Sequence, residues 1–313
     1  MRIGIAALIA GYILDLLLGD PEWLYHPVRL IGKCITFAER KLRARGGDLR
    51  KSAVLLTAST VLVTVAAAAL ALGLLHMAGR IPLFIGMALM DWMGIAVTCM
   101  AKEARGVEKA LERGTDAARK QVARIVGRDT DKLNDEEIIK ATTETVAENT
   151  TDGVVSPLFY AMLGGPVLLW GYKAVNTLDS MVGYLDEKYR DIGWSSAKLD
   201  DVLNYIPARL TAVLMVCAAF LTGLDGRNAW RIVWRDHANH KSPNSAWSEA
   251  AAAGALHIRL GGTHEYFGKP VEKPTIGDAD RLAEKQDIRR VNRLLYGTSV
   301  LMMAVIAAIG LLV

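Results

Sequence analysis

The sequence predicts an all-α protein, a polytopic integral membrane helical bundle with cytoplasmic helical loops. Three observations lead to this prediction. Apolar residues make up 52% of the 313 residues, charged residues still make up 22%, and the two kinds are segregated into alternating stretches. Because a helix needs about 20 apolar residues to cross the hydrocarbon layer, the longest apolar stretches qualify as membrane spans. We expect the whole chain, residues 1–313, to form a single membrane domain.

Three stretches are long and apolar enough to cross a membrane. The first and third contain no Lys, Arg, Asp or Glu, and the second contains only Asp91. A soluble helix rarely stays apolar on every face over such a length, so lipid is the expected surrounding. Arg80 and Pro82, between the first two, predict a tight helical hairpin. The three stretches are residues 52–78, 81–101 and 294–313.

Three further segments are apolar but shorter or interrupted. Residues 3–18 contain a single Asp, and because no small-residue cleavage pattern follows, we keep this segment in the mature protein. Residues 154–172 contain the run Gly164-Gly165-Pro166, and a shorter apolar segment lies near 206–224, of which residues 210–224 are uncharged. The last two segments are predicted either to span the membrane or to enter it and return on the same side.

The polar regions between these segments predict the topology. Regions 20–51, 102–153 and 227–293 are rich in Lys and Arg, which places them in the cytoplasm by the positive-inside rule. Simple alternation would then place region 173–205 outside. If both interrupted segments are re-entrant, all four polar regions face the cytoplasm, and paired interrupted segments are a known way to line a polar site. We prefer this second topology.

Composition excludes several classes of protein. The net charge of +4 is modest and no basic patch is interleaved with aromatic residues, so we expect no nucleic-acid partner. The three cysteines have neither paired nor metal-ligand spacing, which argues against a disulfide framework or a zinc site. No Walker loop and no dinucleotide-binding glycine motif occurs. The cysteines are Cys34, Cys99 and Cys217.

Local patterns predict the elements within the polar regions. Residues 102–126 carry apolar residues at helical spacing, which indicates a helix. Residues 135–151 also indicate a helix, with Asn134 as its N-cap. Residues 260–277 are rich in Gly and Pro and are interpreted as an ordered loop.

The strongest candidate for chemistry is a row of carboxylates at the start of an interrupted segment. Glu144, Glu148 and Asp152 recur every four residues and therefore share one face of a helix. Three aligned carboxylates repel one another unless a cation lies among them, and oxygen ligands suit Mg²⁺ carried by a nucleotide. The alternative interpretation is a solvated acidic face. We favour function because unpaired charge beside a membrane segment is costly.

A second candidate group follows the same apolar segment. Lys173, Asn176 and the pair Asp179-Ser180 lie about one helical turn apart. Lysine suits a phosphate, and Asp or Asn suits a metal or a hydroxyl group. The alternative is an ordinary juxtamembrane helix with a snorkelling lysine. Farther along, at most one of Asp200 and Asp201 is expected to be a ligand, because adjacent residues of a helix point in different directions.

Two shorter motifs complete the candidates. In the run His26-Pro-Val-Arg29, the arginine is able to bind a carboxylate or phosphate at two points, whereas a lone histidine is more often structural. Near the C-terminal end, Asn244 belongs to a Ser-Pro-Asn turn before a helix of small residues that permits close packing. Glu249 lies within that helix, where packing alone does not account for a carboxylate.

These motifs, taken together, resemble one family. The chain resembles the CobD/CbiB family, the adenosylcobinamide-phosphate synthases of cobalamin biosynthesis, and the matching stretches occur in order along most of the chain. They are DLLLGDP at 15–21, HPVR at 26–29, ETVAENTTDGVVSP at 144–157, YKAVNTLDSMVG at 172–183, LNYIPAR at 203–209, SPN at 242–244 and EAAAAGAL at 249–256.

The resemblance implies a multi-pass enzyme of the cell membrane, in contact with membrane lipid. It would join (R)-1-aminopropan-2-ol or its O-phosphate to the one free propionate of adenosylcobyric acid, giving adenosylcobinamide or its phosphate. The implied reaction is an ATP-dependent amide ligation, with ATP and Mg²⁺ entering as a substrate complex. Contact with other enzymes of late cobalamin assembly is a further expectation.

The expected roles rest on residue type and motif. The metal ligands would be Glu144, Glu148 and Asp152. The catalytic residues would be Glu148, Asp179 as the base for the amine, and Lys173. The substrate-binding residues would be Arg29, His26, Asn149, Asn176, Ser180, Asn244 and Glu249. This mechanism requires Glu148 and Asp179 to meet on one side of the membrane.

Two other classes of protein stay open at this point. A transporter would also have broken helices and intramembrane Asp15 and Asp91, although about half of the chain lies in polar regions. A non-catalytic scaffold that binds corrinoid would tolerate neutral residues at Glu144, Glu148 and Asp152. Corrinoid-dependent consumption of ATP would distinguish an enzyme from either one.

Overall fold

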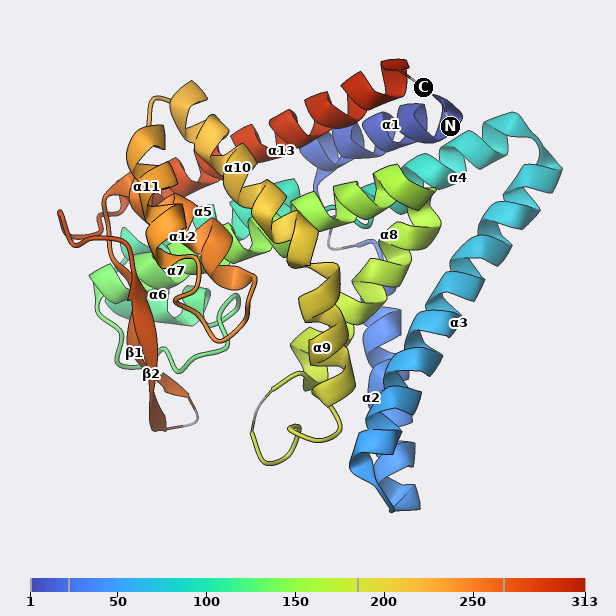
Figure 1. Cartoon of the computed structure of the whole chain (residues 1–313), viewed down its shortest axis with the longest axis horizontal. Helices are drawn as coiled ribbons and strands as arrows, with labels where there is room; N and C mark the ends of the chain where they lie inside the picture. The colour runs from blue at the N-terminus through green and yellow to red at the C-terminus, as the bar shows by residue number, and fades with distance from the viewer. Residues whose placement is uncertain (1, 22, 185, 267, 313) are drawn as a thin grey trace. The chain divides into compact units, whose positions relative to one another are not determined.

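The computed structural model describes residues 2–21, 23–184, 186–266 and 268–312. The described chain is helical apart from one hairpin (Figure 1). The helices are α1 (Arg2–Leu18), α2 (Pro27–Arg45), α3 (Leu49–Ala78), α4 (Arg80–Trp92), α5 (Val97–Leu111), α6 (Thr115–Val122), α7 (Asp135–Thr150), α8 (Ser156–Val182), α9 (Trp194–Leu203), α10 (Tyr205–Leu221), α11 (Gly226–Asp236), α12 (Ser245–Leu256) and α13 (Gln286–Leu312). A π-helical turn, Thr151–Val155, joins α7 to α8, and the strands are β1 (Leu260–Tyr266) and β2 (Lys269–Ile276).

The chain divides into two compact units, each built from several stretches. Unit 1 contains Met1–Ala96, Ser156–Asn204 and Val305–Val313, and unit 2 contains Val97–Val155 and Tyr205–Ala304. Because the chain passes repeatedly between the units, neither corresponds to one continuous segment. The single membrane domain expected from the sequence stays a prediction.

The length and apolarity of the helices confirm the predicted class, an all-α polytopic membrane protein. Four helical segments are long and apolar enough to cross a membrane, and a bent pair, α9 with α10, makes a fifth if it counts as one span. Only 6% of the most apolar part of α3 is buried, and Leu62, Leu70 and Leu74 are exposed, as expected for a helix in contact with lipid. The four segments are Leu49–Ala78, Arg80–Leu111, Asp135–Val182 and Gln286–Leu312.

Breaks within the spans follow the small residues of the sequence. The predicted hairpin is present, since α3 ends at Ala78 and Gly79 turns the chain with φ 119°. The interrupted segment is kinked at Gly165, whose φ is 64°, as its Gly-Gly-Pro run suggested. The segment predicted at 81–101 is not one continuous helix. It is broken at 93–96, where Gly94 lets Leu169 pack against the backbone; a Cβ there would come within 2.1 Å of the Leu169 side chain.

Two expectations for unit 2 are corrected. The helix predicted over 102–126 is two helices, α5 and α6, because Gly114 adopts a φ of 113° between them. The loop expected at 260–277 is an antiparallel hairpin, with a register shift between Gly261 and Gly262. Gly261 has a φ of 74°, and a Cβ there would lie 2.3 Å from the Pro274 carbonyl oxygen, so the irregularity requires glycine.

Candidate active site

In unit 2, the carboxylates of α7 enter a buried polar cluster. The helix starts as predicted, because the Asn134 side chain accepts a hydrogen bond from the Glu137 backbone N–H and the Glu137 side chain accepts one from the Asn134 N–H. Two turns on, Glu144 is buried and forms an ion pair with Arg128, both side chains being only 8% exposed. Its second oxygen accepts a hydrogen bond of 2.7 Å from the Gly261 N–H of β1. Glu144 therefore joins α7 to the hairpin.

Glu148 and Glu249 form the acidic centre of this cluster. Glu148 accepts a hydrogen bond of 3.0 Å from the Ser245 hydroxyl at the start of α12. Glu249, one turn along α12, is buried. Burial, and then the negative charges of Glu148 and Glu144, raise the pKa of Glu249 well above the ordinary value for a glutamic acid. Two neighbouring carboxylates in a buried place are suited to cation binding and proton transfer.

Small residues on α12 allow this helix to pack closely in the interior and so to place Glu249 near Glu148. Gly254 packs against α11 so tightly that a Cβ there would lie 2.7 Å from the Ala229 Cα. Every residue from Ala250 to Leu256 is buried, as the predicted helix of small residues requires. The alanine run therefore allows α12 to pack closely against α11. The same helix places the Glu249 carboxylate in the interior.

The other predicted residues of unit 2 occupy different surroundings. The Asn149 amide donates to the Thr145 carbonyl oxygen of its own helix, at 2.9 Å. Asp152 lies in the π-helical turn rather than on a regular continuation of α7. Asn244 is buried and accepts a hydrogen bond of 3.3 Å from Arg209, whose guanidinium lies 3.5 Å from the centroid of the Tyr205 ring.

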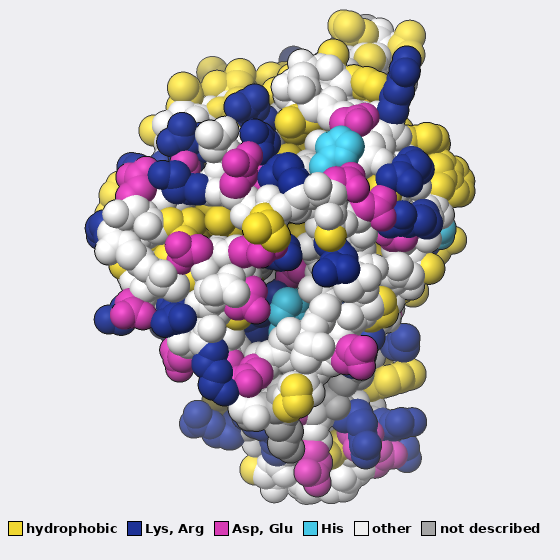
Figure 2. Space-filling view, turned by 90° about the vertical axis from the view of Figure 1, so that its left-hand side faces the viewer, with side chains coloured by type: hydrophobic (Ala, Val, Ile, Leu, Met, Phe, Trp, Pro, Cys, Tyr) yellow, Lys and Arg dark blue, Asp and Glu magenta, His cyan; other side chains and the backbone are white. Residues whose placement is uncertain are grey.

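Basic side chains around the acidic cluster were not identified from the sequence. Burial lowers the pKa of His240, and the charge of Glu148 opposes that effect. Burial, together with the positive charge of Arg128, lowers the pKa of His264. Lys273 of β2 is close enough to favour the charged form of Glu249. Figure 2 shows a face of the molecule on which acidic, basic and histidine side chains are mixed.

The predicted metal ligands do not form a complete metal centre by themselves. Among residues 2–21, 23–184, 186–266 and 268–312, no three His, Cys, Asp or Glu side chains are grouped so as to hold a metal ion. The Glu144 oxygens already accept hydrogen bonds from Arg128 and from the Gly261 N–H. The assignment of Glu144, Glu148 and Asp152 to Mg²⁺ stays a prediction.

In unit 1, a buried hydrogen-bond network centres on Asn204. Its side-chain oxygen accepts from the Ser156 hydroxyl at 2.7 Å and from the Tyr172 hydroxyl at 3.0 Å. Its amide donates to Asp200 at 3.0 Å. Asp200 is buried, whereas its neighbour Asp201 pairs with Lys198 and is partly exposed. The two aspartates therefore lie in different surroundings, and the expectation that at most one of them is a ligand stays a prediction.

This network reaches the second predicted group. Asn176 donates a hydrogen bond to Asp200, and the charge of Asp179 acts on the same carboxylate. Ser180 instead donates to the Thr177 carbonyl oxygen of its own helix, at 3.0 Å. The network thus joins α9 to α8 beside Asp179. Glu148 belongs to the other unit, so its convergence with Asp179 stays a prediction.

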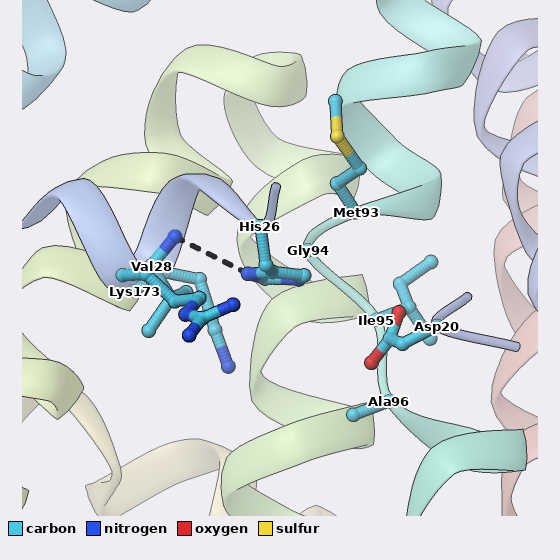
Figure 3. Close-up of a pocket in the computed structure, with 9 residues that line it drawn as sticks. Asp20, His26, Val28, Met93, Gly94, Ile95, Ala96 and Lys173 are labelled. Carbon is cyan, nitrogen blue, oxygen red and sulfur yellow. Dashed lines mark hydrogen bonds between the residues drawn. The ribbon is translucent and has the colours of Figure 1, made fainter. Parts of the chain in front are cut away.

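Unit 1 also contains a small cavity between α2, α8 and the break after α4 (Figure 3). Its volume is about 230 Å³. Three of the predicted residues, His26, Arg29 and Lys173, line it together, although Lys173 is far in sequence from the other two. The remaining lining residues are Asp20, Val28, Met93, Gly94, Ile95 and Ala96.

His26 supports this cavity as the N-cap of α2. Its Nδ1 accepts a hydrogen bond of 3.2 Å from the Val28 backbone N–H, and Pro27 occupies the first helical position. Burial lowers the pKa of His26, which favours the neutral ring that this acceptor role requires. The ring also bonds to the Met93 backbone. His26 therefore fixes the start of α2 against the break after α4.

Several apolar helices together with buried carboxylates define a multi-pass membrane protein with a polar site. The family model described as CobD/Cbib protein matches residues 8–295. The chain belongs to the CobD/CbiB family. No solved structure matches it.

Curated relatives match over nearly their whole length. A protein named cobalamin biosynthesis protein CobD, from Listeria monocytogenes, is 50% identical over 309 residues, covering 97% of each chain. A protein of the same name from Geobacter metallireducens is 48% identical over 303 residues, covering 96% of this chain and 95% of its own. Cobalamin biosynthesis protein CbiB of Salmonella typhimurium is 47% identical over 311 residues, covering 97% of each.

Proposed function

We propose that this protein acts in cobalamin biosynthesis as an ATP-dependent amide ligase of the cell membrane. It joins (R)-1-aminopropan-2-ol, or its O-phosphate, to the free propionate of adenosylcobyric acid. Family membership and the names of the relatives support the pathway. The buried acidic cluster of unit 2 supports the chemistry, because a reaction that handles phosphate and moves protons needs such groups in a protected place.

The cluster of Glu148 and Glu249 is the observation that carries this proposal. Neither carboxylate is needed to join the hairpin to α7, since Glu144 and Arg128 already do so. Glu249 is buried on a helix of small residues, a costly position for a group without a role. Its raised pKa favours the protonated form of Glu249 beside Glu148.

The reaction needs activation of a carboxylate, because hydroxide is too poor a leaving group for an amine to displace. The propionate oxygen attacks the terminal phosphorus of ATP, and ADP leaves. The neutral amine then attacks the acyl carbon of the resulting acyl phosphate. Inorganic phosphate leaves with one of the original carboxylate oxygens, and the amine proton passes to a base.

The residues of unit 2 fit a magnesium ion that arrives with the nucleotide. Mg²⁺ usually binds one or two protein carboxylates and completes its shell with water and phosphate oxygens. Glu148 and Asp152 would supply the protein oxygens. Glu144 would hold Arg128 in place rather than bind the ion directly, because both of its oxygens are engaged. The bound ion would offset the charge that develops on the phosphates.

The residues of unit 1 fit the handling of the amine. Asp179 lies beside the Asp200 network and is the proposed acceptor of the amine proton. Asn176 and Asn204, both bonded to Asp200, fix the geometry around it. In this mechanism, Asp179 and Glu148 act on the same side of the membrane.

The test uses purified protein in detergent with ATP, Mg²⁺, adenosylcobyric acid and either amine. The expected result is ADP formation that requires both the corrinoid and the amine, with a product heavier by the amine minus water in the mass spectrum. ATP turnover that is independent of corrinoid, or none with either amine, would contradict the proposal. A transporter or a corrinoid-binding scaffold would give that second result.

A further inference from the structure

The cavity of unit 1 has charges of opposite sign at its two ends. Lys173 from α8 and Arg29 from the first turn of α2 supply positive charge, and Asp20 supplies negative charge. Figure 3 shows Lys173 and Asp20 on opposite sides of the His26 ring. A cavity with this arrangement complements a small molecule that carries both a cation and an anion.

The positive end suits an oxyanion of high charge. Arg29 lies in the first turn of α2, where the helix dipole adds partial positive charge to that of the guanidinium and the ammonium. Arginine forms two-point hydrogen bonds to phosphate, and lysine adds a compact charge. Since His26 accepts a hydrogen bond from Val28, its neutral ring separates this positive end from Asp20.

The volume of the cavity restricts the ligand. At about 230 Å³ it is smaller than the pockets of drug-sized ligands, which span roughly 300–1,000 Å³. A nucleotide or a corrinoid ring does not fit inside. The propionate arm of a corrinoid is small enough, but it has no cationic group to face Asp20. A phosphorylated amino alcohol has both the right size and both charges.

We propose that the cavity lined by Asp20, Arg29 and Lys173 is the amine-donor subsite, and that these three side chains bind the donor by its two charged ends. The phosphate of 1-aminopropan-2-ol O-phosphate lies against Arg29 and Lys173, and its ammonium group lies against Asp20. This inference rests on the proposed function, because it assigns one substrate of that ligation.

The first test compares the two donors kinetically in two variants, Arg29→Met and Lys173→Met. Each is expected to raise the KM for the phosphorylated donor about 10- to 100-fold, since one charge-assisted hydrogen bond is lost. The KM for free aminopropanol should change less than about threefold, because it has no phosphate to lose. Lys33→Met is the matched control: Lys33 lies on the same helix, stacks on the same Tyr25 ring as Arg29, and does not line the cavity.

The second test measures binding without ATP or corrinoid, by titration calorimetry on the full chain in detergent. Wild-type protein should bind 1-aminopropan-2-ol O-phosphate more tightly than isopropyl phosphate, which lacks the amine. Asp20→Asn should remove most of that difference and retain binding of isopropyl phosphate, which also shows that the variant is folded. Arg29→Met should weaken binding of both phosphates about 10-fold or more.

The outcomes separate the two proposals. If wild-type protein ligates the phosphorylated amine but Arg29→Met and Lys173→Met affect both donors equally, the subsite is wrong and the ligase function stands. If binding follows the expected pattern but no amine is ligated, the subsite stands and the proposed function is wrong. A wild-type protein that binds the two phosphates equally overturns the role of Asp20.

Discussion

Replacing Arg128 with Met is expected to lower the free energy of unfolding by about 3–5 kcal/mol. The guanidinium and its partner Glu144 are almost completely buried, and the variant would leave the carboxylate charged, buried and without its cation. The Gly261 N–H would still bond to Glu144, but it cannot neutralise the charge. Denaturant unfolding in mild detergent, followed by tryptophan fluorescence, measures the change.

The matched control for this variant is Lys132→Met. Lys132 also forms an ion pair with a residue of β1, Glu265, but its side chain is 80% exposed. An exposed pair contributes about 0–1 kcal/mol. The double variant Arg128→Met with Glu144→Gln should be more stable than Arg128→Met alone, because no unpaired charge is then buried. Equal losses for Arg128→Met and Lys132→Met would show that the buried pair does not hold the hairpin to α7.

Glu148→Gln is expected to reduce the rate of ligation about 10²- to 10³-fold, the usual cost of removing one preorganised charge from a reacting centre. Glutamine keeps the shape of the side chain and an oxygen able to accept from Ser245, so membrane insertion and stability should be retained. Because the carboxylate is proposed to bind Mg²⁺, the concentration of Mg²⁺ needed for half-maximal rate should also rise. Initial rates across a magnesium titration measure both effects.

Glu136→Gln is the control for Glu148→Gln. Glu136 lies on the same helix, about two turns before the cluster, and pairs with Lys140, both side chains being partly exposed. Its rate of ligation should stay within about threefold of wild type, since a surface pair contributes little. Full activity in purified Glu148→Gln protein would remove Glu148 from the mechanism.

The fold class was predictable because apolar length is a strong signal. Lipid-spanning segments need long apolar stretches, and the kink at Gly165 and the turn at Gly79 follow from residues that adopt backbone angles closed to others. The break after α4 was not predictable, because it depends on Leu169 packing on Gly94 across the fold. The hairpin was not predicted, because a segment rich in Gly and Pro is typical of a loop. The pairing of its two strands depends on tertiary structure.

The candidate site was predictable in part, for a related reason. Glu144 and Glu148 were predicted as site residues because a spacing of four residues places them on one face of a helix. Arg128 and Asp200 were not predicted as site residues, because their roles depend on the partners that the fold places beside them. Residue type alone does not predict those contacts. The cavity brings Lys173 next to Asp20 and Arg29, although Lys173 is far from both in sequence. No local sequence pattern predicts a contact of this kind.

The central claim, that the corrinoid propionate is activated by phosphorylation, is tested most directly by an isotope. Adenosylcobyric acid labelled with oxygen-18 in its free carboxylate is ligated by wild-type protein, and the inorganic phosphate is analysed by mass spectrometry. One labelled oxygen is expected in the phosphate for each amide bond formed. Amide formation that leaves the phosphate without label would contradict it.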